Sequence, residues 1–414
     1  MRRWQPPRLP RSVWLLESGG FVDSFGTGLV FPFIVLYLHD VRHVSVATAG
    51  FFVAVRGASG FGLAPIGGLL ADRLGARAVA VGSMALAAAG WFALAHVTEA
   101  WQAFVVAVVI GAGNAGFWPA YSAVLADLAP PDVRHAAFSV SNLLRNAGIG
   151  LGAAVGGLVA NTAHPSTYVD LLTVNAITFV AYAFIAIALP RGRAQVASGD
   201  KVESRAGYRQ VLADRALLAL VAVNAGFIAT FTAANSFVAP YLHDHAGVSE
   251  RGIGLAWAIN TGAIVVLQLP IAHVMGRWRY MVGLGIAGGV WALSLCLIAA
   301  TGALLAGSVA VLAVGAAFIL YAVSDCLLTP TQGAIIAGLA PENLRGRYMA
   351  VSAMSWEVGG FVGPAAAGLM YGVAATGMWF VFALVALLTG VAALGAERLL
   401  PEAARRSAAE VSTA

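Results

Sequence analysis

The chain has 414 residues, of which 60% are hydrophobic and only 10% are charged, and its formal net charge is +5. A soluble domain carries about 25% charged residues, so this composition excludes an ordinary water-soluble protein and indicates an integral membrane protein. The basic excess would also suit a nucleic-acid partner, and the positions of the basic residues decide between the two.

Twelve segments are apolar and long enough to cross about 30 Å of hydrocarbon, which takes about 20 helical residues. The first follows an Arg-rich start and is too long for a cleavable signal peptide, so we expect it to remain as a membrane helix. The segments lie at residues 12–38, 47–71, 77–96, 101–127, 136–161, 167–190, 214–242, 250–275, 279–300, 305–338, 346–372 and 375–396.

Lys and Arg alternate with these spans. Of the 24 basic residues, Arg42 and Arg251 fall in loops of one side, Arg56 and Arg145 fall inside spans, and the rest gather on the other side. The positive-inside rule then places both termini and the segment 191–213 in the cytoplasm. The basic excess therefore reports membrane topology, and we expect no nucleic-acid partner.

The first two spans carry charges near mid-membrane, where a charged side chain costs about 2.5 to 3.5 kcal/mol. Asp23 and Arg56 enter the membrane from opposite sides on sequential helices, which tend to be neighbours. We expect them to pair, either structurally or as a switch in which Asp23 is protonated in one state and ion-paired in another. Glu17 is shallower, and we expect a helix-end acid that reaches interfacial water.

The second span ends in GGLLADRLGAR, residues 67–77, where glycines allow a tight turn and an Asp can cap or salt-bridge a neighbouring helix end. This pattern resembles the signature of the major facilitator superfamily between its second and third helices, with Ala76 where that family usually has a second basic residue. The resemblance implies a cytoplasmic latch that is made and broken as two halves rock; the alternative is a loop that only fixes topology. In the second half, His273 stands where the acid would be. The latch residues are Gly68, Asp72, Arg73, Gly75 and Arg77.

The stretch GLVFPFIVLYL in the first span resembles the same helix of bacterial twelve-helix multidrug:proton antiporters of this superfamily. Many of those have an Arg in the fourth helix where this chain has Ala107. If that Arg is needed for proton coupling, coupling in this chain uses other groups.

Glycines four residues apart in the fifth span share one helix face and let another helix approach closely. They resemble the antiporter signature of the superfamily, with Ala153 in place of its Pro, which the eleventh span restores; the alternative is tight packing without antiport. Arg145 shares this face, so we expect it to point towards the interface between the halves and to need an acidic partner. The seam consists of Gly148, Gly152, Gly156, Gly157, Gly359, Gly363 and Pro364.

The polar segment 191–213 separates six spans from six, and the two sets are repeats. A shift of 211 residues places Pro130 on Pro341 and Arg134 on Arg345, and a shift of 204 places YLHD at 37–40 on YLHD at 241–244. Two homologous six-helix halves are the architecture of a secondary transporter with a midplane substrate site. We predict an all-α membrane protein of the major facilitator fold, with halves at 1–190 and 214–397, a linker at 191–213 and a tail at 398–414.

Two further acids lie deep in the second half. Asp325 falls on Asn114 in the repeat alignment. The resemblance to the superfamily, whose fourth and tenth helices line the cavity, implies that both face it. Asp325 would be a proton carrier, a fixed charge for a cationic substrate or a buried hydrogen-bonding residue. Glu357 lies one position past the equivalent of Arg145, off the glycine face. The proton-coupling candidates are thus Asp23, Asp325 and Glu357. The cavity candidates are Asn114, Trp118, Asn224, Phe231, Asn235, Thr329 and Gln332.

Most histidines are predicted on the outer face, and HDH at 243–245 suits a helix end better than a metal site, so we expect no metal. No Walker motif or catalytic triad is present in the sequence, which predicts neither an enzyme nor ATP-driven transport. We expect a monomer in the lipid bilayer of a bacterial inner membrane, with no cofactor and a proton gradient as its energy source.

These features favour proton-coupled efflux of hydrophobic or cationic small molecules. Import or facilitated transport of a sugar or other metabolite is the alternative within transporters, and the amides of the cavity candidates would suit it. A lipid flippase on the same fold also remains open, whereas a receptor needs neither a latch nor midplane acids.

Overall fold

A computed structural model describes residues 9–130, 133–189, 210–275, 278–339, 341 and 344–401. The described residues form helices connected by short turns, without a β-strand. The chain divides into two compact units, Met1–Val44 with Val55–Gly199 and Ser45–Ala54 with Asp200–Ala414. The segment 45–54 therefore belongs to the second unit, although the sequence placed it in the first half.

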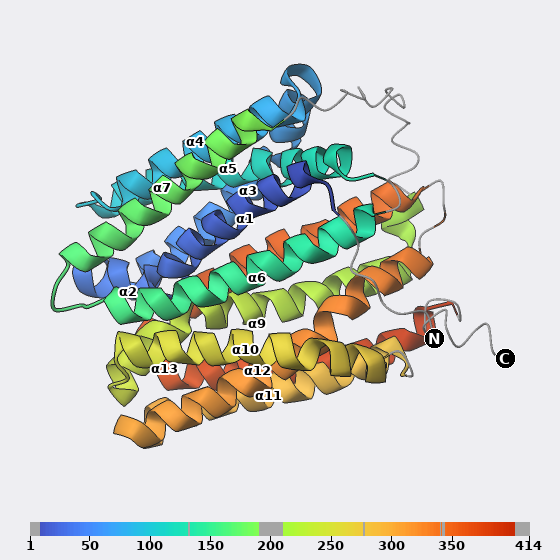
Figure 1. The fold of residues 1–414 in the computed structure, drawn as a ribbon. Helices are drawn as coiled ribbons and strands as arrows, with labels where there is room; N and C mark the ends of the chain where they lie inside the picture. Colours follow the sequence, from blue (N-terminus) through green and yellow to red (C-terminus); the bar gives the residue numbers. More distant parts are fainter. Residues whose placement is uncertain are drawn as a thin grey trace. The chain divides into compact units, whose positions relative to one another are not determined.

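The first unit contains six long helices, the number that the sequence predicts for one half (Figure 1). The first of them changes character at Pro32, where the chain passes through short 3₁₀ and π segments before it ends at Val41. The elements are α1 (Arg11–Val30), η1 (Phe31–Phe33), α2 (Ile34–Leu36), η2 (Tyr37–Val41), α3 (Val46–Leu74), α4 (Ala76–Leu94), α5 (Ala100–Leu128), α6 (Arg134–Val159) and α7 (Ser166–Ala188).

The second unit repeats this order. Its last long element is two helices joined across Ala374, whose φ of −155° and ψ of 75° are not helical, so it accounts for two predicted spans. The elements are α9 (Arg215–Ala246), α10 (Glu250–Met275), α11 (Tyr280–Leu304), α12 (Gly307–Leu339), α13 (Arg345–Ala396) and η4 (Glu397–Leu399).

Ten helices of the described chain are long and apolar enough to cross a membrane. The count differs from twelve because α13 is a single element and α6 is too polar along its first half, which contains Arg134, Asn142 and Arg145. Mean hydropathy depends only on composition. It does not show that these polar groups belong to a helix that packs on α1.

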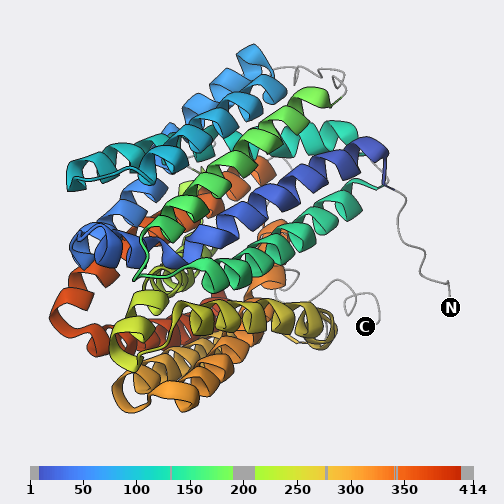
Figure 2. The same ribbon diagram turned by 60° about the vertical axis from the view of Figure 1, so that its left-hand side comes forward.

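Helix packing within the units follows the repeat. In the first unit α1 packs on α6 and α7, and α4 packs on α5 and α7 (Figures 1 and 2). In the second unit α9 packs on α13, and α11 packs on α12 and α13. The first helix of each unit therefore lies against its fifth, and the third lies against the fourth and sixth.

The repeated YLHD motif has the same structural role in both units. The hydroxyl of Tyr37 donates to the carbonyl of Leu94 at 3.0 Å, and the hydroxyl of Tyr241 donates to the carbonyl of Ala299 at 2.9 Å. Each tyrosine thus ties the end of its unit's first helix to the end of the third.

Candidate functional site

The glycine seam is a close helix contact within each unit. A Cβ built at Gly148 would lie 2.9 Å from the carbonyl oxygen of Phe21 on α1, and one at Gly359 would lie 2.7 Å from that of Ala225 on α9. Gly152 and Gly363 face the same two helices even more closely. The sequence predicted that this face lies between the halves, which is wrong for these glycines because they pack inside their own unit.

Arg145 on α6 has contacts within the first unit. Its guanidinium carbon lies 5.2 Å from the ring centre of Trp118 on α5, and it donates to Asn142 Oδ1 at 3.0 Å. Trp118 is 46% exposed, so it is not a core side chain. Asn114, one turn earlier on α5, is half-buried.

Asp23 and Arg56 do not form the predicted ion pair in this structure. Arg56 places its guanidinium carbon 5.8 Å from the ring centre of Trp91, a cation–π contact between α3 and α4. One carboxylate oxygen of Asp23 is buried without a hydrogen-bond partner. A fixed structural pair is therefore wrong for this conformation, because Trp91 rather than Asp23 takes the guanidinium.

Glu17 is the acid that sequence reasoning placed wrongly. Its side chain is 2% exposed, and its Oε1 accepts a 2.8 Å hydrogen bond from the hydroxyl of Tyr121 on α5. Tyr121 in turn contacts the hydroxyl of Ser141 on α6. Depth counted along one helix cannot detect this burial, since the residues that cover Glu17 lie more than a hundred positions away.

An aromatic cluster occupies the second unit and consists of Phe231, Trp257, Trp291, Phe318 and Tyr321. The ring of Tyr321 on α12 lies 5.3 Å from that of Phe231, 4.7 Å from that of Trp291 and 6.1 Å from that of Trp257. These centroid distances are typical of interacting aromatic side chains. The cluster therefore joins α9, α10, α11 and α12.

Asp325 lies one turn beyond Tyr321 on α12, so the two share a helix face. Asp325 is half-buried, and its Oδ1 accepts a 3.1 Å hydrogen bond from the hydroxyl of Thr329. The aromatic cluster and the carboxylate are thus neighbours along α12, and two predicted site residues, Asp325 and Thr329, are in contact.

The amide candidates of the second unit are already bonded. Asn235 accepts from the hydroxyl of Tyr321 at 3.1 Å and donates to the carbonyl of Phe231 at 2.9 Å. Asn224 donates to Ser355 Oγ at 2.5 Å. The side chain of Gln332 lies outside the described residues. Glu357 is half-buried on α13 between Trp356 and Val358, which are both more than half exposed.

The latch signature forms the turn between α3 and α4. Gly75 has a φ of +87° and ψ of 143°, which side chains rarely adopt, and its N–H donates to the carbonyl of Ala71. Arg77 is half-buried at the start of α4, Arg73 is exposed, and Gly68 has open space around it. The side chain of Asp72 lies outside the described residues.

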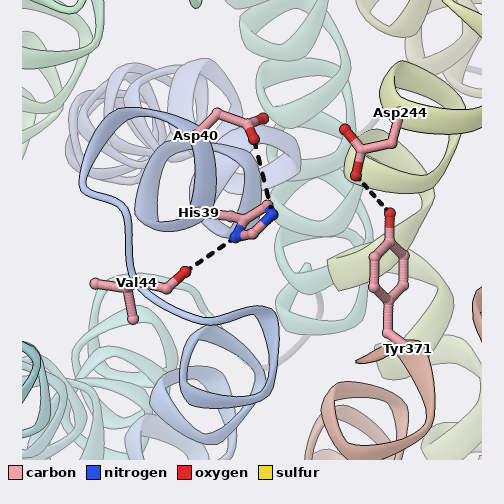
Figure 3. Close-up of polar contacts among 5 residues, drawn as sticks. All are labelled: His39, Asp40, Val44, Asp244 and Tyr371. Carbon is pink, nitrogen blue, oxygen red and sulfur yellow. Dashed lines mark hydrogen bonds and ion pairs between the residues drawn. The ribbon is translucent and has the colours of Figure 1, made fainter. Parts of the chain in front are cut away.

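Histidines at the helix ends bond within their own units. His39 Nδ1 lies 3.0 Å from the carbonyl oxygen of Val44, and its Nε2 lies 4.0 Å from Asp40 Oδ1 (Figure 3). In the second unit, Tyr371 on α13 donates to Asp244 Oδ2 at 2.8 Å, also drawn in Figure 3, and the ring of His245 stacks on Tyr241.

Two small cavities lie at repeat-equivalent positions. Leu16, Ala80 and Val124 line the first, and Leu220, Leu284 and Ile335 line the second. The shifts of 204 and 211 residues that align the repeats superimpose these three pairs. Side chains 204 or 211 residues apart thus line matching cavities, as an internal duplication requires.

Two repeated units of membrane-spanning helices, with acids and aromatic rings inside them, define a multi-pass membrane transporter and not an enzyme. The chain belongs to the Major Facilitator Superfamily, whose family model matches residues 16–323 and 225–413. The resemblance read from the latch is therefore confirmed at the level of the family.

Relatives and solved structures agree with this assignment. The Multidrug resistance protein MdtH of Aeromonas salmonicida (strain A449) is 26% identical over 359 residues, which cover 86% of this chain and 87% of that protein. The Uncharacterized MFS-type transporter YttB of Bacillus subtilis (strain 168) is 24% identical over 380 residues, 89% and 91% of the two chains.

Similar solved structures include the nucleoside transporter NupG, with a TM-score of 0.77 and 15% identity over 94% of this chain and 99% of that one. A POT family transporter in complex with 5-aminolevulinic acid has a TM-score of 0.77 and 16% identity over 94% and 97% of the two chains. At this identity the likeness shows the fold alone.

Proposed function

We propose that this chain is a proton-coupled efflux transporter that exports hydrophobic or cationic small molecules across a bacterial inner membrane by alternating access. The relatives named multidrug resistance proteins, aligned over 86% of the chain, support the substrate class. The observation that carries the proposal is the position of Asp325 beside the aromatic cluster of the second unit.

Asp325 and the aromatic cluster suit a lipophilic cation. Aromatic faces attract cations within about 6 Å of the ring centre, and the attraction grows when water is excluded. A carboxylate one helical turn beyond Tyr321 adds an opposite charge beside the cluster, in which Phe231 is the ring that is not fully buried. The amide of Asn235 is occupied by Tyr321 and the Phe231 carbonyl, so it has less bonding capacity for the hydroxyls of a sugar.

Asp23 supports the proton-coupled part of the proposal. An ionised carboxylate is costly to bury without partners, and binding a proton removes this charge. One Asp23 oxygen is buried and without a hydrogen-bond partner in the first unit. A proton moving through about 100 mV yields about 2.3 kcal/mol, and one pH unit adds about 1.4 kcal/mol. Together they would hold a neutral substrate at a gradient of roughly several hundred to one.

The orientation of the protein in the membrane follows from the charge distribution of its loops. Nearly all Lys and Arg outside the spans fall on one side, which the positive-inside rule assigns to the cytoplasm together with both termini. In inverted membrane vesicles, export from the cell becomes uptake into the vesicle.

The test is uptake of a fluorescent lipophilic cation, ethidium, by inverted vesicles with and without an imposed pH gradient. We expect uptake that stops when the gradient is dissipated and that falls by about tenfold or more in Asp325→Asn. The matched control is Asp170→Asn, which removes an exposed acid from α7. Uptake that needs no gradient would overturn antiport, and a gradient effect seen with a sugar but with no cation would favour the metabolite alternative.

A further inference from the structure

Glu17 has the least exposed side chain of the described acids, at 2%, and none of the proposed roles above uses it. It is the seventh residue of α1, about 9 Å along the helix from Arg11 at about 1.5 Å per residue. Three helices of the first unit, α5, α6 and α7, pack against α1. An acid is rarely kept in such a place without a specific reason.

We propose that Glu17 is a proton-binding site of the first unit, and that Tyr121 and Ser141 are positioning residues that hold its carboxyl group in both protonation states. The inference rests on the proposed proton-coupled transport and adds to it a second acid on the helix that carries Asp23.

The hydrogen bonds of the cluster suit an acid that gains and loses a proton. While Glu17 is ionised it only accepts, so Tyr121 donates to it at 2.8 Å and Ser141 donates to Tyr121. When a proton binds to Glu17, its O–H can donate to Tyr121, and the tyrosine can then donate to Ser141. The two hydroxyls reverse direction together, so in both states Glu17 Oε1 keeps its hydrogen bond to Tyr121, and Tyr121 keeps its hydrogen bond to Ser141.

The surroundings of Glu17 contain little compensating charge. From α7, the buried hydroxyl of Tyr182 has no hydrogen-bond partner and lies 3.7 Å from a Cβ built at Gly20, which is itself 3.8 Å from Glu17 Oε2. On α6 the charged group is Arg145, held over Trp118, and on α1 Arg11 and Asp23 each lie six residues from Glu17. From α4, Arg77 lines the neighbouring cavity with Tyr121 and Tyr182.

No ion pair forms between Glu17 and any of the described basic residues. Binding of a proton therefore removes an uncompensated charge from a low-dielectric site, which is the property that a coupling acid needs.

The repeat supplies a natural contrast. The shift of 204 residues places Val221 of α9 on Glu17, and Asn224 on Gly20. The second unit thus keeps a polar contact near the matching cavity, Asn224 to Ser355, but none of the described residues that line this cavity titrates. The proposed proton site therefore belongs to the first unit alone. It is not a feature that both copies of the duplicated fold share.

The first experiment separates coupling from transport in reconstituted vesicles. In Glu17→Gln we expect gradient-driven ethidium uptake to fall by about tenfold or more, while gradient-free exchange of ethidium stays within about twofold of the unmodified protein. The control Asp170→Asn should change neither. Gradient-driven uptake that survives Glu17→Gln would overturn the inference.

The second experiment reads the proton directly and does not depend on transport. Infrared difference spectra of the purified protein across a pH titration should show the carbonyl stretch of a protonated carboxyl group that disappears in Glu17→Gln. In Tyr121→Phe the midpoint of this band should move to higher pH by about one unit, because the ionised form loses a charge-assisted donor. A merely structural tyrosine would lower thermal stability without moving the midpoint.

The two measurements distinguish failure of the proposed proton site from failure of the proposed function. A band that depends on Glu17 in a protein without gradient-driven transport would sustain the proton site and overturn the proposed function. A spectrum in which no titrating band is lost in Glu17→Gln would overturn the site, whatever the transport result. If Glu17→Gln does not fold, the shift in Tyr121→Phe decides, and an unchanged midpoint would count against the inference.

Discussion

At the scale of single residues, Gly75 is the part of the latch whose backbone requires its residue type. Its φ of +87° and ψ of 143° lie in a region that is essentially restricted to glycine, although nothing lies within 4 Å of the position of a Cβ. We expect Gly75→Ala to lower the free energy of unfolding by about 1–3 kcal/mol through backbone strain alone. Thermal unfolding of the purified protein in detergent measures this loss.

The matched control for Gly75→Ala is Gly68→Ala. Gly68 also has open space around it, but it lies within helix α3, where alanine is the better residue. We therefore expect no loss of stability in the control. Equal midpoints for the two variants would mean that the turn between α3 and α4 relaxes and that its glycine is not required.

Residue identity was easier to predict than residue environment. The sequence identified Asp23 and Arg56 as charges inside spans, and both lie within helices α1 and α3. Their partners were not predictable, because Arg56 faces Trp91 on α4, and helix rotation sets this contact rather than spacing along one helix. Glu17 was misplaced for the same reason, since its cover comes from Tyr121 on α5.

At the scale of helices, the contact between α1 and α6 depends on the absence of side chains. A Cβ at Gly152 would overlap the carbonyl oxygen of Phe25 on α1. We expect Gly152→Ala to force the helices apart and to cost about 1–3 kcal/mol, the usual range for overpacking. The thermal midpoint in detergent should fall in Gly152→Ala and stay unchanged or rise in Gly82→Ala, which fills open space on α4.

The repeat extends this prediction to the second unit. Gly363 meets the carbonyl of Ala229 on α9, whereas its neighbour Gly360 has nothing within 4 Å. Gly363→Ala should therefore be destabilising and Gly360→Ala tolerated. A reversed order would show that the seam is not what holds the first and fifth helices of a unit together.

Helices and their repeat were accessible from the sequence because hydropathy and spacing encode them directly. The partner of the glycine seam was not. Spacing shows that Gly148, Gly152 and Gly156 share a face, but which helix meets that face depends on the packing order, and this order places α1 there. Mean hydropathy misjudges α6 for the same reason. Its polar residues lower the mean hydropathy of the segment, but the sequence does not show that the helix packs on α1.

At the scale of the whole molecule, α3 is shared between the two units. It is one helix from Val46 to Leu74, yet Ser45–Ala54 belongs to the second unit and the remainder to the first. A Cβ built at Gly50 would lie 2.7 Å from the carbonyl oxygen of Pro364 and 2.9 Å from Cα of Gly368, so this start of α3 packs tightly on α13. Any rearrangement of one unit against the other must therefore bend α3 or detach its first turns from α13.

This geometry predicts that a covalent bond between the start of α3 and α13 stops alternating access. A Cβ at Gly368 would lie 3.3 Å from Cα of Ala47, so the two Cα atoms lie within about 5 Å, at the short end of the about 4.4–6.8 Å that a disulfide spans. In a background with Cys296→Ala and Cys326→Ala, oxidation of the pair Ala47→Cys and Gly368→Cys should abolish ethidium uptake, and a reductant should restore it.

The control for this cross-link is the pair Ser294→Cys and Ala317→Cys, which joins α11 to α12 inside the second unit. These positions are close, because the hydroxyl of Ser294 donates to the carbonyl of Ala317 at 2.8 Å. Because α11 and α12 lie wholly within the second unit, whereas α3 continues into the first, we expect transport to continue after this oxidation. Full transport by the oxidised Ala47→Cys, Gly368→Cys protein would mean that the two parts of α3 move independently. The flexible point would then lie within α3, after Ala54, where the helix passes from one unit to the other.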